Sequence, residues 1–600
     1  MKSKSALLVV ILALASYAEA KKDKLAPELQ NQTVSNSVNV IVQFNAPPTA
    51  ADLTKISNHG GRSSGSIGLV NGMQVSLPAN QADGLSDETS VKFISPDRPV
   101  KGSLTNSAPA INAPYAWGLG LDGSGIGVAV IDSGIGPKTS SVSISDLNKF
   151  GSTTSRVVYS QSWVNDGLGS YDGYGHGTHV AGIIGGNGYN STGSADFQTI
   201  KGIAPNVQLI NLRVLDSTGT GTDSSVIAAI QAAISLKKKY NIRVINLSLG
   251  RPVYESYTLD PLCQAVEAAY KAGIVVVVAA GNDGRNDSAG NGGYGTIYAP
   301  ANDPYVITVG AMKSMGTPTR ADDLIATYSA KGPTAIDHIA KPDLVAPGNR
   351  VVSVLENANA PLAVAYPENV ISKSYYMNSP VATVTATKMT AAATTTSSTT
   401  TSSTPSSYFT LSGTSMAAPA VSGAAALLLQ KNSNLTPDQV KARLMKTAYK
   451  VFPQFSSYTD PLTGITYTDQ YDLFTVGAGY LDLQAALANT DSFTGVATSP
   501  TVAYDSTSQS VYFVNNSFAV WGGSSNWTSF AVWGGNTFVS NNFAVWGGSS
   551  PWASFAVWGG SAPWGNNTNN GFFAVWGGNS VSASGTPTKD AVNMMIKGDN

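Results

Sequence analysis

Five runs of Val, Ile, Leu and Ala constrain the fold of this 600-residue chain more than any other feature. The runs are IGVAVIDSG, VQLINLRVL, IRVINLSLG, IVVVVAAGN and YVITVGAM, and all lie within residues 115–490. Near-continuous apolar runs, rather than alternating apolar and polar residues, are typical of strands buried on both faces of a parallel sheet. The sequence therefore predicts an α/β domain with a doubly wound, mainly parallel sheet over residues 115–490.

Two helices of this domain can be located from the sequence. Apolar residues recur on one face of residues 223–240, as they do in an amphipathic helix. A second helix begins at TPDQ, with Thr436 as N-cap, Pro437 in the first helical position and Gln439 completing a capping box. In doubly wound sheets, ligands bind outside the carboxyl ends of the strands. The residues that end each apolar run are therefore candidates for the functional site.

Three motifs at such positions carry residues suited to nucleophilic catalysis. VIDSG contains Asp132, GHGTHVAG contains His176, and SGTSMAAP, which follows the expected strand YFTL, contains Ser415. A Ser hydroxyl becomes a good nucleophile when an imidazole removes its proton and a carboxylate fixes the imidazole tautomer. The chain supplies one candidate for each role. Taken alone, Asp132 could instead cap a turn before Gly134.

The four histidines of the chain can be sorted by context. His176 and His179 are spaced as H-x-x-H, whereas a zinc peptidase needs H-E-x-x-H, so metal ligation by this pair is disfavoured. His179 is expected to pack one turn further along the helix. His59 lies in a separate N-terminal unit, and His338 lies in an expected loop. His176 remains as the candidate base.

The three motifs, in the order Asp, His, Ser, resemble the signatures of the subtilisin-like serine peptidases (peptidase family S8). The α/β-hydrolases differ, because their order is Ser, Asp, His and their elbow is G-x-S-x-G; residues 413–417 read G-x-S-x-A. The resemblance implies that Asp132, His176 and Ser415 form a catalytic triad and that the fold is subtilisin-like. It also implies a serine endopeptidase that acts on proteins or peptides through an acyl-enzyme intermediate.

The resemblance extends to residues around the triad. AAGNDG contains Asn282, which relatives use in the oxyanion hole, and NLSLG and STGTG resemble the two edges that clamp an extended substrate. Residues 279–281 would line the primary specificity pocket, with Asp283 at its rim. The implied substrate-binding residues are Gly219, Thr220, Gly221, Ser248, Leu249, Gly250, Ala279, Ala280 and Gly281.

No cofactor is required for this chemistry, but relatives often bind structural calcium in surface loops. The loop GGNGYNSTGSADFQ offers Asn187, Asn190 and Asp196 without a recognisable ladder of ligands, and solvated turns fit it equally well. Structural calcium is therefore left open, and the metal ligands are unknown.

The N-terminus predicts secretion. Lys2 and Lys4 precede an apolar run over residues 6–15, and Ala-Glu-Ala at 18–20 fits a cleavage site. The run is too short to span a bilayer, and no polar pattern supports the alternative of a buried N-terminal helix. Residues 1–20 are predicted to be a signal peptide, with residues 21–37 as a linker. The mature protein is expected to be secreted, extracellular or associated with the cell surface, with no transmembrane anchor after signal removal.

Residues 38–100 are predicted to form a small unit of their own. Apolar residues alternate over 38–44 and 73–77, VKFIS follows, and residues 49–59 are compatible with a helix. A ferredoxin-like β-α-β-β-α-β order fits this pattern. Its position and its resemblance to the family's pro-segments imply an intramolecular inhibitor whose C-terminal end lies in the substrate cleft until it is cut.

Two segments have compositions that set them apart from the domain. Residues 376–407 are rich in Ser, Thr and Ala and are predicted to be a surface insertion. Residues 495–600 form a β-rich or irregular tail in which FAVWGG occurs five times. These repeats could present an aromatic face to a surface, a polymer or a partner. Their Trp and Phe residues could equally pack one repeat onto the next, which is the commoner role of a regular aromatic ladder.

Composition narrows the function further. Charged residues are 12% of the chain, the net charge is −1 and no basic run occurs, so nucleic acid is not expected as a partner. Cys263 is the only cysteine, which excludes an intramolecular disulfide and favours a small core residue. We expect a secreted, self-processed serine endopeptidase. The alternative is a surface adhesion or binding protein whose peptidase domain only processes itself.

Overall fold

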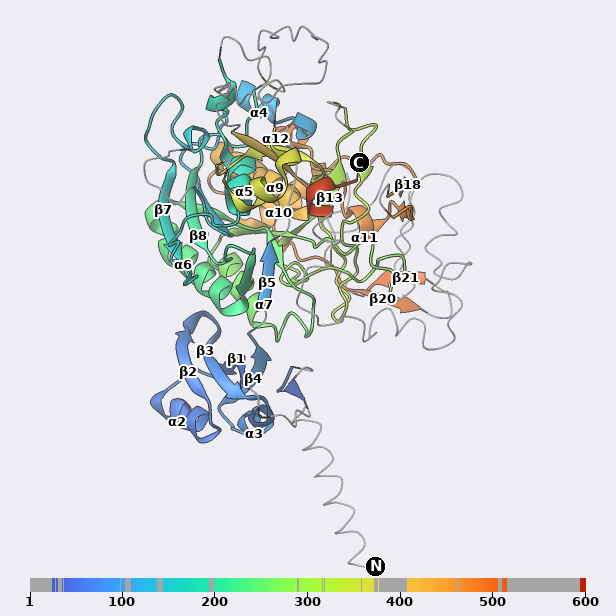
Figure 1. Cartoon of the computed structure of the whole chain (residues 1–600). Helices are drawn as coiled ribbons and strands as arrows, with labels where there is room; N and C mark the ends of the chain where they lie inside the picture. The colour runs from blue at the N-terminus through green and yellow to red at the C-terminus, as the bar shows by residue number, and fades with distance from the viewer. Residues whose placement is uncertain are drawn as a thin grey trace, which may run out of the picture.

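The computed structural model places most of the chain from residue 37 to residue 514 (Figure 1). The described residues are 24–26, 29–30, 35, 37–97, 99–102, 109–136, 144–193, 199–288, 291–315, 317, 319–357, 359–371, 376, 407–460, 463–505, 510–514 and 594–599. The expected signal peptide, nearly all of the Ser/Thr-rich insertion and the FAVWGG repeats lie outside these residues.

The described part of the chain is built around an eight-stranded sheet with the order β14-β13-β12-β10-β6-β8-β7, in which β15 also pairs with β13. Its strands are β6 (Gly127–Asp132), β7 (Val157–Ser162), β8 (Gln208–Arg213), β10 (Ile242–Leu247), β12 (Val275–Ala279), β13 (Ile307–Lys313), β14 (Leu324–Ile325) and β15 (Leu344–Pro347). Each of the five apolar runs forms a strand (β6, β8, β10, β12, β13), and these strands pair in parallel. The expected α/β fold with a mainly parallel sheet is confirmed.

Helices cover both faces of this sheet. The helices α5 (His176–Gly185), α9 (Thr414–Lys431) and α10 (Pro437–Thr447) lie on one face, and α6 (Asp223–Tyr240) and α7 (Pro261–Lys271) lie on the other. Strand β6 shows why its sequence is apolar at every position. Val128 and Val130 join the core beneath α5 and α9, whereas Ala129 and Ile131 join the core beneath α6 and α7.

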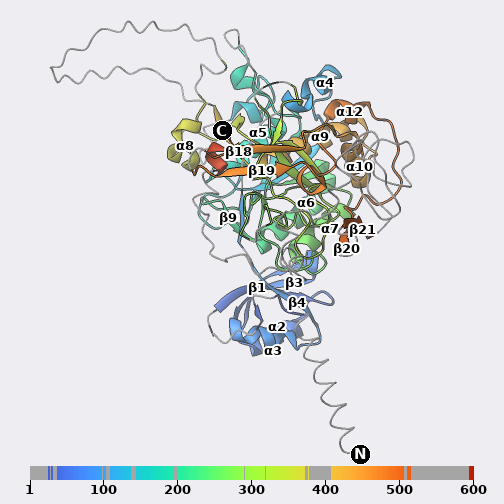
Figure 2. The ribbon, with the colours of Figure 1, turned by 90° about the vertical axis from the view of Figure 1, so that its right-hand side faces the viewer.

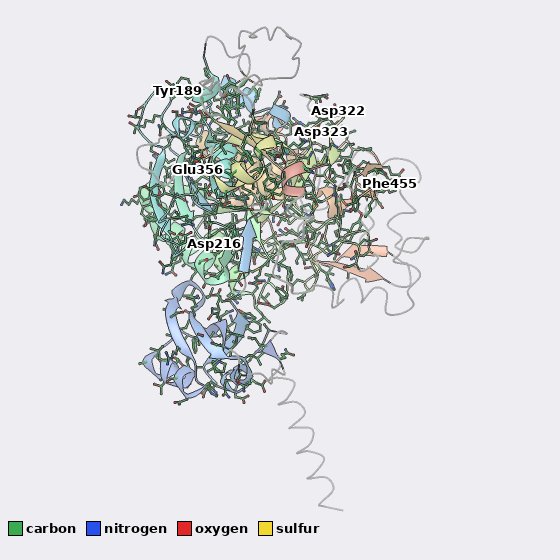
Figure 3. The ribbon with its side chains drawn as sticks, viewed as in Figure 1. Tyr189, Asp216, Asp322, Asp323, Glu356 and Phe455 are labelled. Carbon is green, nitrogen blue, oxygen red and sulfur yellow. The ribbon has the colours of Figure 1, made fainter. Side chains whose placement is uncertain are left out.

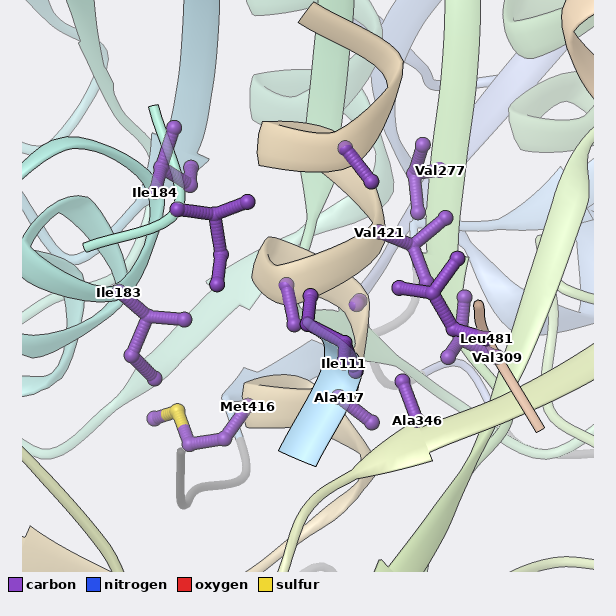
Figure 4. Close-up of a cluster of buried hydrophobic side chains, with 14 of the residues drawn as sticks. Ile111, Ile183, Ile184, Val277, Val309, Ala346, Met416, Ala417, Val421 and Leu481 are labelled. Atoms are coloured by element: carbon purple, nitrogen blue, oxygen red, sulfur yellow. The ribbon is translucent and has the colours of Figure 1, made fainter. Parts of the chain in front are cut away.

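Helix α9 is the central element of the larger core and is buried along almost its whole length. Figure 4 shows Met416, Ala417 and Val421 of this helix among apolar side chains of the sheet and of α5, including Val277 and Ile184. Met416 and Ala417 directly follow Ser415. Burial of these neighbours fixes the start of the helix and therefore the backbone of Ser415.

The two helices located from the sequence have the expected starts. Helix α6 spans the expected residues 223–240, and Thr222 is its N-cap and accepts a hydrogen bond from the N–H of Ser225. Helix α10 begins with the expected capping box between Thr436 and Gln439. Local hydrogen bonding of this kind is encoded within a few residues, which is why it can be read from sequence.

The N-terminal unit is a four-stranded antiparallel sheet with two helices. Its elements are β1 (Ser37–Phe44), α2 (Ala50–Asn58), β2 (Arg62–Ile67), β3 (Gly72–Pro78), α3 (Ala82–Ser86) and β4 (Val91–Pro96), with the strand order β2-β3-β1-β4. Ile41, Ile67 and Val70 of this unit join the core that covers α6 and α7. Figure 2 shows the unit against that side of the large domain.

Other, shorter helices and strands belong to the described chain. They are α4 (Ala113–Gly118), α8 (Pro361–Ala365), α11 (Leu473–Val476), α12 (Leu483–Ala488), β5 (Pro99–Gly102), β9 (Thr220–Thr222), β11 (Leu249–Gly250), β16 (Val351–Val354), β17 (Tyr408–Leu411), β18 (Phe455–Thr459), β19 (Thr466–Gln470), β20 (Val502–Asp505) and β21 (Ser510–Phe513). Strand β17 is the expected YFTL strand before Ser415, and it pairs with β16. Among the described residues, no helix combines the length and apolar character needed to cross a bilayer.

A buried ion cluster joins the beginnings of α6 and α7. The Arg251 guanidinium, 2% exposed as a residue, lies 2.9 Å from a carboxylate oxygen of both Asp223 and Asp260. Asp223 is the first residue of α6, and Asp260 is the N-cap of α7. Burial lowers the pKa of Arg251, but the two carboxylates raise it further, so the net shift is upward. Arg251 therefore remains charged, and it directly follows β11.

We predict that Arg251→Met, made in a Ser415→Ala background that prevents self-digestion, lowers the free energy of unfolding by about 3–5 kcal/mol. The reason is that Asp223 and Asp260 would stay buried without their counter-charge. Urea unfolding followed by circular dichroism provides the measurement. Lys238→Met is the matched control, because it removes one exposed charge from the opposite end of α6 and should change stability by less than about 0.5 kcal/mol. Equal unfolding midpoints for the two variants would contradict the prediction.

Candidate active site

Asp132 and His176 meet at the carboxyl end of β6. Asp132 is the last residue of β6, and His176 is the first residue of α5. The Nδ1 atom of His176 lies 2.5 Å from Oδ1 of Asp132, and both side chains are fully buried. The same carboxylate oxygen accepts a hydrogen bond from the N–H of Ser133 at 2.7 Å. The carboxylate thus holds one nitrogen of the imidazole ring in a fixed orientation.

This contact requires α5 and the end of β6 to approach each other closely. A Cβ atom on Gly177 would lie 2.2 Å from the carbonyl oxygen of Gly134 and 3.1 Å from Cβ of Asp132. Gly134 itself has a φ of +114°, which side-chain-bearing residues rarely adopt. The glycines of VIDSG and GHGTH are therefore needed for the Asp132–His176 contact.

Asp172 positions the beginning of α5, and it was not among the residues singled out from sequence. Its buried carboxylate accepts five hydrogen bonds. The donors are the hydroxyls of Ser133 and Thr178 and the N–H groups of Tyr174, Gly175 and Thr178. Burial raises the pKa of Asp172, and these hydrogen bonds oppose that shift. Asp172 ties the loop after β6 to the first turn of α5. The only sequence signal for this positioning role is that Asp172 stands four residues before His176.

Ser415 lies in the first turn of α9, behind strand β17. Its Oγ donates a hydrogen bond to the carbonyl oxygen of Ser248 at 3.1 Å, and the Ser248 hydroxyl donates to the carbonyl oxygen of Ser415. Asn246 at the end region of β10 donates in turn to the Ser248 hydroxyl at 2.9 Å. Because α9 packs against both α5 and β10, Ser415 lies at the same edge of the sheet as Asp132 and His176.

Asn282 follows β12 and is oriented by the residue that precedes Ser415. Its Oδ1 accepts hydrogen bonds from the N–H of Thr414 at 2.9 Å and from the Thr414 hydroxyl at 3.1 Å. The Thr414 hydroxyl also accepts from the N–H of Gly281 at 3.1 Å. With its oxygen engaged in this way, the Asn282 side chain directs its NH₂ group away from Thr414.

The other histidines have different surroundings. His179 Nε2 donates to the carbonyl oxygen of Phe409 in β17 at 3.0 Å, and burial lowers the pKa of His179 to about 3. His179 is therefore neutral and supports the strand that leads to Ser415. His59 faces Glu88 within the N-terminal unit at 3.8 Å. His338 lies in a loop at a φ of +54°.

The two predicted substrate-binding edges face each other, and a segment of the chain itself lies between them. Strands β11, β5 and β9 form a three-stranded antiparallel sheet in that order. Val100 of β5 pairs with Gly221, and Lys101 pairs with both Thr220 and Gly250. Asp216 accepts hydrogen bonds from the N–H groups of Thr218 and Thr220 and shapes the loop before β9; it lies beside β5 in Figure 3. Gly219, Ser248 and Leu249 belong to the same two edges.

Tyr298 occupies the space beside the segment Ala279–Gly281. A Cβ atom on Gly281 would lie 3.0 Å from the Tyr298 ring, and one on Gly250 would lie 3.1 Å from Cβ of Tyr298. The Tyr298 hydroxyl donates to Asp283 at 2.6 Å, and burial raises the pKa of Asp283. Ala280 accepts a hydrogen bond from the N–H of Tyr298. No motif marks Tyr298 in the sequence, because its role comes from packing between two distant segments.

A metal site is not assigned. No group of three or more His, Cys, Asp or Glu is placed to hold a metal ion in the part of the chain that the structure describes. Of the loop residues considered for calcium, Asn187 uses its side chain to bind Asn148 and Tyr189, and Asn190 donates its N–H to Asp146. Asp196 lies outside the described residues.

The chain is similar in sequence to several known proteins. Residues 123–479 match the family model described as the Subtilase family. The chain belongs to the subtilase family. It is 34% identical to the serine protease AprX of Bacillus subtilis over 60% of this chain and 70% of that protein. It is 30% identical to subtilisin E of Bacillus subtilis over 75% of this chain and 94% of that protein. An extracellular serine proteinase of Thermus sp. is 31% identical over 65% of this chain and 76% of that protein.

Membership defines the class of reaction. The chain is a serine endopeptidase, a hydrolase that cuts peptide bonds within proteins. Subtilases need no cofactor for catalysis. A mechanism can therefore be derived from the protein side chains and main-chain groups described above.

We predict that Asp172→Asn lowers kcat/KM by between about tenfold and a hundredfold, because His176, the base expected from the sequence, would be displaced from its position. The new NH₂ group could not accept the hydrogen bonds that one carboxylate oxygen accepts now. Hydrolysis of a peptide p-nitroanilide measures the effect. Thr178→Ser is the control, since it keeps the hydroxyl that donates to Asp172 and should retain nearly full activity. Unchanged kcat/KM in Asp172→Asn would refute the positioning role.

Proposed function

We propose that this subtilase is a secreted endopeptidase made as a self-processed zymogen, with Asp132, His176 and Ser415 as its triad. The observation that carries the proposal is the buried Asp132–His176 contact at the same sheet edge as Ser415. The order of these residues along the chain, and the glycines that permit their approach, support the assignment.

In the proposed mechanism, Ser415 Oγ attacks the scissile carbonyl while His176 Nε2 takes its proton. Asp132 accepts from the Nδ1–H of His176, keeps the ring in the required tautomer and stabilises the imidazolium that forms. The N–H of Ser415 and the NH₂ group of Asn282 donate to the oxyanion. The imidazolium then returns its proton to the leaving amine. Water, activated by the same imidazole, hydrolyses the acyl-enzyme.

The zymogen assignment is supported by the position of β5. This strand directly follows the N-terminal unit and lies between β9 and β11 as an extended substrate would, with main-chain pairing on both sides. Gly102 pairs with Leu249, next to Ser248 and hence to Ser415. We therefore place the processing site in the residues that follow Gly102.

A second contact supports docking of the N-terminal unit as a pro-segment. Asp97 accepts hydrogen bonds from the N–H and the hydroxyl of Ser224 at 2.9 and 2.6 Å. Ser224 lies in the first turn of α6, where a carboxylate interacts favourably with the helix dipole. Gln74 of β3 donates to the same hydroxyl at 2.8 Å. The unit thus binds the domain through both polar and apolar contacts.

Secretion is supported by the leader pattern at residues 1–20 and by the extracellular relative from Thermus sp.. Structural calcium remains a prediction without assigned ligands. The alternative function in adhesion depends on the FAVWGG repeats, which lie outside the described residues. Binding of a surface or polymer that is retained in Ser415→Ala would support it.

We predict that Ser415→Ala abolishes casein hydrolysis and labelling by a serine-directed organophosphonate, with a loss of activity on the order of 10⁶-fold. Asn282→Ala should lower kcat by about 10² to 10³, because one oxyanion donor is lost. Asn286→Ala, an exposed residue of the same loop, is the matched control and should keep full activity. Casein hydrolysis that persists in Ser415→Ala would exclude this residue as the nucleophile.

We also predict that a chain lacking residues 21–100 fails to reach an active state. The N-terminal unit covers apolar residues of the core around α6 and α7, and β5 bridges two edges that otherwise remain unpaired with each other. Recovery of casein hydrolysis after refolding, with and without the separate unit supplied in trans, is the measurement. Equal recovery without the unit would show that it is neither a folding aid nor an inhibitor.

A further inference from the structure

The C-terminal segment, residues 594–599, packs onto the peptidase domain away from the N-terminal unit β1–β4 (Figures 1 and 2). Met595 and Ile596 are 6% and 3% exposed and belong to the same apolar core as α9. The nearest described residue before the segment is Val514, at the end of the β20–β21 hairpin. Residues 594–599, which follow the FAVWGG repeats in the sequence, thus contact the domain.

Asp599 anchors this segment. The residue is 1% exposed, and its carboxylate lies 2.6 Å from the Arg285 guanidinium and accepts the N–H of Thr327 at 2.8 Å. Its main chain makes two further hydrogen bonds with the side chain of Asn349, at 2.9 and 3.1 Å. Gly598 fits at a φ of +61°, where a Cβ atom would lie 2.2 Å from the Ser412 hydroxyl. The segment therefore fits the surface of the domain closely, through the Asp599 carboxylate, Gly598 and the apolar side chains of Met595 and Ile596.

That surface adjoins the active site. The N–H of Ser412, three residues before Ser415, donates to the carbonyl oxygen of Met595 at 2.7 Å. The Tyr174 hydroxyl contacts the Met595 sulfur at 3.6 Å, and the Tyr174 ring stacks on His176 with a centroid distance of 6.4 Å. The segment therefore contacts the residues just before Ser415, through Ser412, and the residues just before His176, through Tyr174.

Asn369 joins this segment to β17. Its amide donates to the carbonyl oxygen of Ile596 at 2.8 Å and to that of Thr410 in β17 at 2.7 Å. Main-chain carbonyls of the segment are thus bound by a main-chain N–H and a side-chain amide. Recognition of this kind is suited to any polypeptide, since it reads the backbone.

We propose that residues 594–599 occupy the approach by which the leaving-group side of a polypeptide substrate reaches Ser415, so that the segment must be displaced before long substrates are cut. This inference rests on the proposed function and goes beyond it, because it adds an inhibitory contact at the opposite end of the chain from the N-terminal unit.

The two approaches to Ser415 are held by different segments. Strand β5 pairs with β9 and β11 on the side of Ser248. The C-terminal segment contacts Tyr174, Asn349, Asn369 and Ser412, none of which pairs with β5. An extended substrate advances about 3.3 Å per residue, so two or three residues beyond the cut bond would already reach the surface around Ser412. With both segments in place, Ser415 and His176 are each 0% exposed.

The contact can be tested in the processed enzyme with two substrates that share one acyl half. One is an internally quenched peptide with residues on both sides of the cut bond, and the other is a p-nitroanilide with none beyond it. Truncation after residue 593 is expected to raise kcat/KM about tenfold for the long peptide. This value corresponds to an intact enzyme in which the segment is displaced in about one tenth of the molecules. It should change the value for the anilide less than twofold. A synthetic peptide of residues 593–600 should restore inhibition toward the long peptide.

A pair of point variants separates the segment from its anchor. Asp599→Asn removes the charge that pairs with Arg285 and should raise long-peptide activity, as truncation does. Asp460→Asn is the control, because Asp460 also pairs with Arg285, at 3.0 Å, but belongs to the chain between β18 and β19. Asp460→Asn should leave the ratio of the two kcat/KM values unchanged.

Three outcomes would overturn the inference: no change in that ratio, equal change for both substrates, or a joint loss of activity and thermal stability that marks the segment as structural only. Failure of the proposed function would differ, since the anilide would then not be cut at all. Binding of the 593–600 peptide to the truncated Ser415→Ala protein, measured by calorimetry, tests the docking itself without any turnover.

Discussion

The contact between Asp132 and His176 is the constraint on which the rest of the structure depends. It forms only if the end of β6 and the first turn of α5 approach so closely that Gly177 has no room for a side chain. Because both side chains are fully buried, water does not compete for the hydrogen bond between them. The sheet, the glycines and the Asp172 carboxylate together fix the distance between Asp132 and His176. Helix α9 places Ser415 at the same edge of the sheet.

The two neighbouring buried histidines meet different partners. His176 faces a carboxylate, whereas His179, one turn later, faces a main-chain carbonyl oxygen, and its pKa falls to about 3. Charge on His179 would be unpaired in an apolar surrounding, so it stays neutral and serves packing. The H-x-x-H spacing by itself could not separate these roles. The two roles are distinguished by the group that each imidazole ring contacts in the folded protein.

Features encoded by local sequence were predicted well. The five apolar runs, the α10 capping box and the bounds of α6 depend on patterns within a few residues, and the strand and helix positions followed from them. Asp172, Tyr298 and the edge strand β7 were missed. Asp172 and Tyr298 act through contacts with segments that are distant or folded back, and β7 is half exposed at the sheet edge and lacks an apolar run. Such features depend on tertiary packing, which composition and periodicity do not record.

In the zymogen that we propose, the chain itself is a temporary ligand for the two edges β9 and β11. The main-chain groups of β9 and β11 that pair with β5 are suited to bind any extended peptide, and without β5 they would be open to non-specific pairing. Strand β5 satisfies both edges at once, and its covalent link to the N-terminal unit gives it a high effective concentration there. Such a link loses its effect when the chain is cut. In the zymogen that we propose, inhibition by the tethered strand would therefore be strong before processing and weaker once the chain is cut.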